Sequence, residues 1–188
     1  MKNLISFITI PLMAFLFMCT WTGCSSDSGS DSDIIVYMND EDVMTVFSLT
    51  NSFRTGNEAV YVNQDNSINT TLLGQLGTLT LDEGLCRAAA VRAKEIVGKF
   101  SHTRPNGSGC STVLNELGLS LSFSGENIAA GNKSGERTFL QWKEDDENYD
   151  GQGHRRNMLN QNSTKIGIAY AYDASSTYKY YWVMILAR

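Results

Sequence analysis

The C-terminal sequence contains Ile166-Gly167-Ile168-Ala169-Tyr170-Ala171-Tyr172, in which large apolar side chains alternate with small ones. This period of two is typical of a β-strand. A polar turn follows at 173–177, and the chain returns through 178–187, where apolar side chains occupy both alternating sets of positions. A strand that is apolar on both faces is usually covered on both faces. We therefore expect a central hairpin with helices on either side of the sheet.

Helical periodicity precedes this hairpin. It is strongest at 80–98, where apolar residues recur at helical spacing and Thr80 and Glu83 have the form of a capping box. We expect further helices at about 39–54, at 111–117 and from 134 onward, and an extended segment at 126–130. Together these elements predict an α+β fold, a three-layer α-β-α sandwich with a mainly antiparallel central sheet.

The charge of the chain lies at its N-terminal end. The 188 residues carry a formal net charge of -5, from 15 Lys and Arg against 20 Asp and Glu. Six of the acidic residues lie within 24–42, and the charges balance from residue 43 onward. Nucleic-acid binding needs clustered positive charge, so this composition argues against that class. The length suits one domain, which we place at 39–188 and expect to be monomeric.

Residues 1–23 have the pattern of a signal sequence, with Lys2 before an apolar run that ends in small residues. A retained membrane helix is the alternative, because about 20 apolar residues can cross a bilayer. Thr22-Gly23-Cys24 resembles the lipobox of bacterial lipoproteins, which implies that Cys24 is lipidated and anchors the protein to a membrane. Residues 24–38 then form a flexible acidic tether. We expect a bacterial cell-envelope lipoprotein, at the outer membrane or the surface, or else a secreted protein.

The body of the chain keeps two cysteines, Cys86 and Cys110. An even pair in an exported protein permits a disulfide. Two independent free thiols are the alternative, since free Cys is common in protein cores.

The chain has only two histidines, His102 and His154, and each lies beside arginine in a loop that contains Gly or Pro. Loops on a rigid scaffold often carry function. Three signatures are missing from the sequence: His-Glu-x-x-His, Gly-x-Ser-x-Gly and the phosphate-binding Gly-x-x-x-x-Gly-Lys-Ser/Thr. Ser101 neighbours His102, but adjacency in sequence does not align a hydroxyl with that imidazole, so a serine nucleophile is unsupported.

Four motifs occur in order along the body. They are Phe100-Ser101-His102-Thr103-Arg104-Pro105, Gly125-Glu126-Asn127-Ile128-Ala129, Gly153-His154-Arg155-Arg156-Asn157-Met158-Leu159, and Ile166-Gly167-Ile168-Ala169-Tyr170 with Tyr181-Trp182-Val183. These motifs resemble the CAP superfamily, whose SCP domain is shared by cysteine-rich secretory proteins, antigen-5 allergens and plant pathogenesis-related proteins. The resemblance extends from about residue 42 to 188 and implies a cleft with two histidines and two acidic residues.

The resemblance assigns these positions one by one. The histidines are His102 and His154, and the first acidic residue is Glu126. The second acidic residue falls on Asp145, three positions after a tryptophan and four before Tyr149. Glu144 is the alternative, although a helix would turn its side chain about 100° away from that of its neighbour. Further donors in the cleft are Arg104 and Asn157.

Two imidazoles and two carboxylates allow three kinds of chemistry. They can bind Zn²⁺ or another divalent cation, serve as a general acid and base in a peptidase, or form a polar network that only fixes the shape of a cleft. The resemblance implies no single reaction, so enzymatic activity stays open. Our main hypothesis is an extracytoplasmic protein that binds a metal, lipid or peptide ligand, and the alternative is a secreted His/Glu or metal-assisted peptidase.

Overall fold

The protein contains a five-stranded sheet with strand order β1-β4-β5-β3, in which β2 pairs with β4 outside this path. A computed structural model describes residues 33–60, 67, 76–144 and 153–188. All pairings are antiparallel except that of β2 with β4, which is parallel. The strands are β1 (Ile35–Tyr37), β2 (Thr80–Leu81), β3 (Phe123–Ala130), β4 (Lys165–Tyr172) and β5 (Tyr180–Ala187). The expected C-terminal hairpin is confirmed as β4 and β5, and it forms the centre of the sheet.

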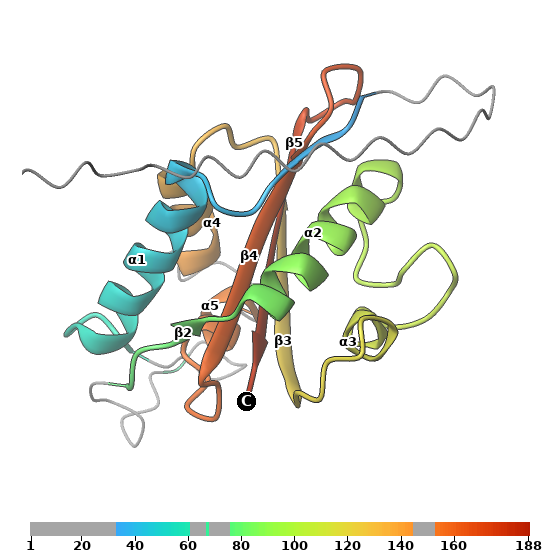
Figure 1. Ribbon diagram of the computed structural model, residues 1–188. Coiled ribbons are helices and arrows are strands. Elements are labelled where there is room, and N and C mark those ends of the chain that lie inside the picture. Colours follow the sequence, from blue (N-terminus) through green and yellow to red (C-terminus); the bar gives the residue numbers. More distant parts are fainter. Residues whose placement is uncertain (1–32, 61–66, 68–75, 145–152) are drawn as a thin grey trace, which may run out of the picture. The chain divides into compact units, whose positions relative to one another are not determined.

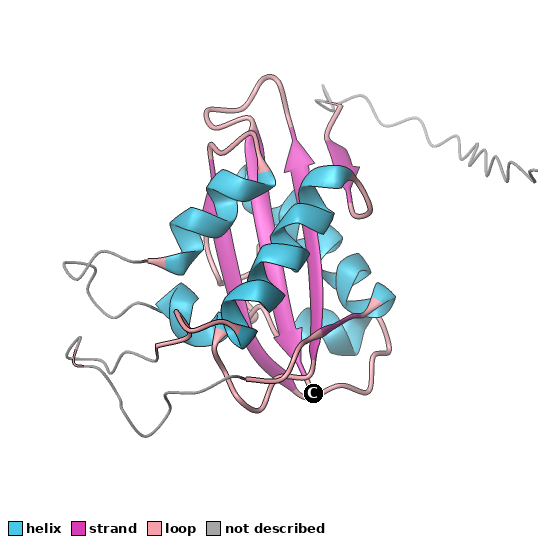
Figure 2. Cartoon of the chain, turned by 90° about the vertical axis from the view of Figure 1, so that its left-hand side faces the viewer, coloured by secondary structure: helices cyan, strands magenta, loops and turns pink. Residues whose placement is uncertain are grey.

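Helices cover both faces of this sheet (Figures 1 and 2). They are α1 (Glu41–Thr55), α2 (Glu83–Gly98), α3 (Thr112–Glu116), α4 (Gly135–Lys143) and α5 (Gly153–Met158). Figure 1 shows α1, α4 and α5 on one side of the strands and α2 and α3 on the other. The predicted three-layer α-β-α sandwich is thus confirmed.

Strand β4 supplies a different surface to each layer because its side chains alternate between the two faces. Ile166, Ile168 and Tyr170 belong to the apolar cluster beneath α1 and α4. Ala169 and Ala171 belong to the cluster beneath α2. The small side chains on the second face let α2 lie close to the strand.

The start of α2 differs from the predicted capping box. Thr80 lies in the short strand β2, where it pairs with Lys165 of β4. Asp82 is the N-cap instead, and its Oδ1 accepts a hydrogen bond from the Leu85 amide at 3.0 Å. The prediction was wrong because it followed the local motif and did not foresee that the preceding residues extend the sheet.

Cys86 and Cys110 are both free thiols. Cys86 is buried within α2 against β4, and this burial raises the pKa of its thiol. Cys110 lies in the loop before α3 and is partly exposed. Of the two possibilities for these residues, the structure therefore shows separate thiols and no disulfide between them.

The predicted signal sequence and residues 24–32 of the tether lie outside the described residues. The end of the predicted tether is not a flexible segment, because Ile35–Tyr37 pair with β4 as strand β1. Among the helices that the structure describes, none has the length and apolar character needed to cross a bilayer.

Candidate functional site

The first predicted histidine is held by a carboxylate of the sheet. His102 follows α2 in a loop, and its ring nitrogen Nδ1 lies 2.8 Å from Oε1 of Glu126 on β3. The Glu126 side chain is only 1% exposed, whereas that of His102 is 54% exposed. These two candidate residues therefore lie in contact, with the carboxylate in the interior and the imidazole open to solvent.

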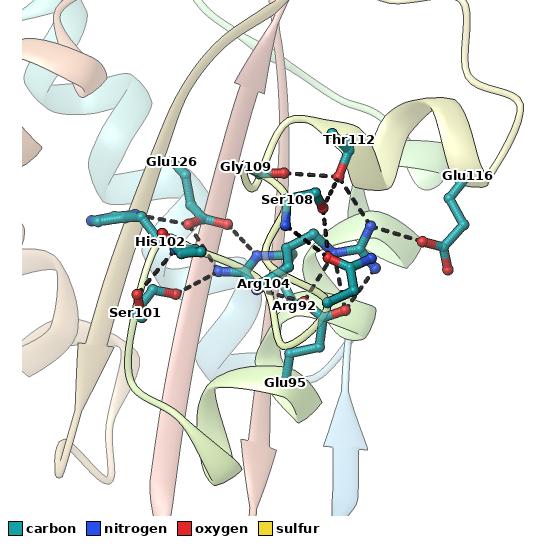
Figure 3. A network of polar contacts seen from close by, with 12 residues as sticks. Arg92, Glu95, Ser101, His102, Arg104, Ser108, Gly109, Thr112, Glu116 and Glu126 are labelled. Carbon is teal, nitrogen blue, oxygen red and sulfur yellow. Dashed lines mark hydrogen bonds and ion pairs between the residues drawn. The ribbon is translucent and has the colours of Figure 1, made fainter.

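A buried arginine that the sequence analysis missed holds Glu126 in place (Figure 3). Arg92 of α2 donates from Nε to Oε2 of Glu126 at 2.8 Å and from Nη2 to the Ser101 carbonyl at 2.8 Å. It also donates to Glu95 at 2.5 Å. Arg92 lies on the apolar stripe of its helix, three residues after Ala89. A charged residue at such a core position could have indicated from the sequence that a buried charged partner lies nearby.

Arg104 stabilises the His102 loop and does not donate to the histidine in the structure. Its guanidinium donates to Oε1 of Glu95 at 2.6 Å and to Oε2 of Glu116 at 2.7 Å. Its own backbone amide donates to the Ser108 carbonyl at 2.9 Å. Figure 3 shows this network between α2, the loop and α3.

The second histidine has an equivalent carboxylate partner. Nδ1 of His154, in α5, lies 2.5 Å from Oε1 of Glu144, and Oε2 of Glu144 accepts from the Arg155 amide at 3.2 Å. Glu144 is the residue directly after α4 and has a left-handed backbone, with φ 49°. Its side chain is 3% exposed. The helical argument against Glu144 fails because the helix has already ended at Lys143.

Asp145, which the resemblance placed at the second acidic position, and Tyr149, four positions later, both lie outside the described residues. Their roles stay predictions. The structure assigns the observed contact with His154 to Glu144, which was the alternative in the sequence analysis.

Both histidines are tied to neighbouring residues of β3, which is an edge strand. The side chain of Glu126 contacts His102, and Nδ2 of Asn127 donates to the His154 carbonyl at 3.1 Å. Adjacent residues of a strand point to opposite faces, so the two histidines approach this edge from the two sides of the sheet.

Asn157 fixes α5 to the same edge. Its Nδ2 donates to the Glu126 carbonyl at 3.2 Å and to Oδ1 of Asn127 at 2.8 Å. This close approach requires Gly125, because a Cβ at that position would lie 2.7 Å from Oδ1 of Asn157. Asn157 is therefore a positioning residue for the helix that carries His154.

The candidate metal ligands include a cysteine that the sequence analysis considered only as a disulfide partner or a free core thiol. Among the described residues, one group of three potential ligand atoms lies within 4.8 Å of one another, and it comprises His102, Cys110 and Glu126. His154 is not part of this group, so an ion shared by the two histidines stays a prediction.

The contacts of His102 also raise its pKa to about 9, through hydrogen bonds first with Cys110 and then with Glu126, which outweigh the opposing effect of burial. In the unfolded chain the same histidine has a pKa of about 6.5. Between pH 6.5 and pH 9 the folded protein therefore binds more protons than the unfolded chain. We expect the stabilisation from this contact to be present below pH 6.5 and to be lost as the pH rises through 9.

NMR titration of the metal-free protein checks this expectation. The imidazole signal assigned to His102, by its disappearance in His102→Ala, should titrate near pH 9. Because the side chain is half exposed, solvent screening keeps the matching change in stability small. A midpoint at or below 6.5 would contradict the contacts described above.

Comparison with known proteins agrees with the fold and the motifs. The α-β-α sandwich, with two histidines that each contact a carboxylate at the edge of the sheet, has the features that the resemblance to the CAP superfamily implied. The family model of the cysteine-rich secretory protein family, CAP, matches residues 47–186. The chain belongs to this family.

One curated relative, the uncharacterized protein YkwD of Bacillus subtilis, is 32% identical over 102 residues, which cover 53% of this chain and 37% of YkwD. The chain therefore matches little more than a third of that relative's length.

Three solved structures share the fold. An extracellular protein with an SCP domain from Bacillus anthracis has a TM-score of 0.55 at 22% identity, covering 77% of this chain and 40% of that one. An outer surface protein of Borrelia burgdorferi has a TM-score of 0.58 at 17% identity, covering 82% and 98%. NaASP2, solved with Zn²⁺, has a TM-score of 0.54 at 18% identity, covering 79% and 80%.

Proposed function

We propose that this chain is an extracytoplasmic CAP-domain protein that binds a divalent cation, Zn²⁺ or a related ion, through its two histidines. One observation carries the proposal: His102 and His154 each place Nδ1 on a carboxylate that is almost completely buried, with 1% and 3% exposure for Glu126 and Glu144. A carboxylate hydrogen-bonded to one ring nitrogen is typical of metal-binding histidines, and both histidines of this chain have one.

The chemistry follows from the two ring nitrogens. His102 carries a second proton below its pKa of about 9, and a binding ion displaces that proton to solvent. The neutral imidazole then donates its Nδ1–H to the carboxylate and offers the lone pair on Nε2. The carboxylate fixes the tautomer and the ring orientation and makes the free nitrogen a stronger ligand. Zn²⁺ accepts such nitrogen ligands together with oxygen or sulfur. Glu126 and Glu144 would orient His102 and His154, and water or an external ligand would complete the coordination.

Residues 1–38 support a location outside the cytoplasm. The cationic start, the apolar run and Cys24 have the pattern of a lipoprotein signal. Two of the solved structures with this fold are described as an extracellular and an outer surface protein. We therefore extend the proposal to export and to membrane anchoring through a lipid on Cys24.

Calorimetric titration of Zn²⁺ into the purified protein tests the cation site. We expect one ion per chain, and binding that is weakened at least about tenfold in both His102→Ala and His154→Ala. The chain has no other histidine, so no further imidazole can contribute heat. Equal heats in the parent and both variants would refute the proposal, and loss in His102→Ala alone would restrict the site to one side of β3.

A further inference from the structure

The loop after α2 forms a small hairpin that places a thiol opposite His102. Thr103 and Gly109 form an isolated antiparallel bridge. The next pair in that register is His102 with Cys110, and directly opposed residues of antiparallel strands have Cβ atoms about 5 Å apart. The backbone register therefore brings an imidazole and a thiol together from positions eight residues apart.

This hairpin is held firmly. The Gly107 amide donates to the Arg104 carbonyl at 2.9 Å, and Gly107 has a φ of 85°, which favours glycine. The Arg104 guanidinium lies between Glu95 of α2 and Glu116 of α3. Since these contacts tie the loop to α2 and α3, they also hold Cys110 close to His102.

Three different kinds of donor atom meet at this point. The Cys110 sulfur, a His102 ring nitrogen and a Glu126 oxygen lie within 4.8 Å of one another. The three residues differ in exposure to solvent: Glu126 is buried, Cys110 is partly exposed and His102 is exposed. The thiol is free of any disulfide. The cluster is thus open to solvent on one side and anchored in the core on the other.

We propose that Cys110 is a thiolate ligand of the cation site, which makes the site selective for thiophilic ions such as Zn²⁺, Cd²⁺ and Cu⁺ over Mg²⁺ and Ca²⁺. This inference rests on the proposed function and adds a ligand that the histidine pair does not supply. The ion binds Nε2 of His102 and Sγ of Cys110, while Glu126 stays hydrogen-bonded to Nδ1. The thiol releases its proton to solvent when the ion binds.

The geometry suits such an ion after a small adjustment. Two ligands of a tetrahedral Zn²⁺, with bonds of about 2.0 to 2.3 Å, lie roughly 3.5 Å apart. The ligand atoms lie within 4.8 Å of one another, so the nitrogen and the sulfur reach this separation by approaching each other by at most about 1.3 Å. The His102 side chain is exposed enough to make this movement. Thiolate ligands select Zn²⁺ and softer ions, whereas Mg²⁺ and Ca²⁺ prefer oxygen.

The charges around the cluster favour an additional cation. The network contains the carboxylates of Glu95, Glu116 and Glu126 against the guanidiniums of Arg92 and Arg104. Leaving His102 aside, the carboxylates exceed the guanidiniums by one, and Glu126 presents its Oε1 to the histidine. A positive charge at His102, carried either by the imidazole's own proton or by a bound ion, compensates this excess.

Cobalt substitution tests the thiolate directly, because a sulfur-to-cobalt bond gives a charge-transfer absorption band in the near ultraviolet that nitrogen and oxygen ligands do not give. We expect the band when Co²⁺ is titrated into the purified protein. Cys110→Ser should lose the band and bind Zn²⁺ about 10- to 100-fold more weakly. Cys86→Ser is the matched control and should keep both the band and the affinity, because that thiol is buried in α2 and is not part of the group of His102, Cys110 and Glu126. Thermal melting of each variant establishes that it is folded.

Alkylation gives a second measurement. Bound Zn²⁺ should slow the reaction of Cys110 with iodoacetamide, followed by mass spectrometry, whereas Mg²⁺ should not. Tight Zn²⁺ binding without a charge-transfer band, or with unchanged affinity in Cys110→Ser, would refute the thiolate ligand and leave the proposed function intact. No binding of Zn²⁺ or Co²⁺ by any form would refute both.

Discussion

Gly167→Ala is expected to lower the melting temperature by about 10 °C, because it disrupts the contact between β4 and α2. A Cβ at position 167 would lie 2.1 Å from the carbonyl carbon of Leu85 and 2.4 Å from its Cβ. The obstructing atoms include backbone of a helix, so no side-chain rotation relieves the clash. Overpacking usually costs about 1 to 3 kcal/mol, and we expect about 3 here. In a domain of this size each kcal/mol shifts the melting temperature by about 2 to 4 °C.

Gly98→Ala is the matched control for this prediction. Gly98 is the last residue of α2, and among the described residues an added Cβ would meet no atom within 4 Å apart from its chain neighbours and the backbone of its own helix. Alanine is a better helix former than glycine, so this variant should be unchanged or more stable by less than about 1 kcal/mol. Thermal denaturation followed by circular dichroism compares the two variants. Equal melting temperatures would mean that α2 does not pack on Gly167 as closely as described.

The alternation in β4 predicted the sheet but could not predict this contact. Large residues at 166, 168 and 170 and small ones between them indicate a strand with two unequal faces. Which helix covers the small face depends on the register of distant segments, and the local sequence of α2 does not contain that information. For the same reason the capping box at Thr80 was a wrong prediction: the residue pairs with β4, and Asp82 starts the helix.

The site could be predicted from its motifs at three positions. His102, Glu126 and His154 lie in motif segments, and the structure places a carboxylate on each histidine. The partner of His154 was harder to predict because it depends on where α4 ends. If α4 continued to residue 145, helical spacing would favour Asp145 as the partner. The helix ends at Lys143, and the left-handed backbone of Glu144 turns the Glu144 side chain toward α5.

The proximity of Cys110 to His102 could not be predicted from the sequence pattern either. Two cysteines in an exported chain indicate a disulfide by count alone. The position of Cys110 opposite His102 follows from a hairpin register set by Arg104 and Gly107. Since such a register depends on a single bridge, neither residue spacing nor composition reveals it.

Glu126→Ala is the second variant with a large expected effect, because Glu126 serves two groups at once. Arg92 has a side chain with 0% exposure, and two of its nitrogens donate to Glu126, at 2.8 and 3.2 Å. Removing one partner of a buried ion pair typically costs about 3 to 5 kcal/mol. Arg92 keeps its contacts with Glu95 and Ser101, so we expect about 3 kcal/mol, at the lower end of that range.

Glu126→Gln separates the two roles of this residue. The amide preserves the volume and an acceptor oxygen, so the loss of stability should be smaller than in Glu126→Ala. The negative charge that orients His102 is removed, and Zn²⁺ affinity should still fall about 10- to 100-fold, as for other partners of metal-binding histidines. Urea denaturation and Zn²⁺ calorimetry on the same samples measure the two effects.

Glu83→Gln is the control for both measurements. Glu83 forms an ion pair with Arg87 on the surface of α2, with its side chain 89% exposed. Exposed pairs contribute little, so its stability should change by less than about 0.5 kcal/mol and its Zn²⁺ affinity not at all. If Glu126→Gln retained full Zn²⁺ affinity while losing stability, Glu126 would serve the core through Arg92 alone. A loss of affinity that exceeds the loss of stability would instead establish that the buried carboxylate acts through His102.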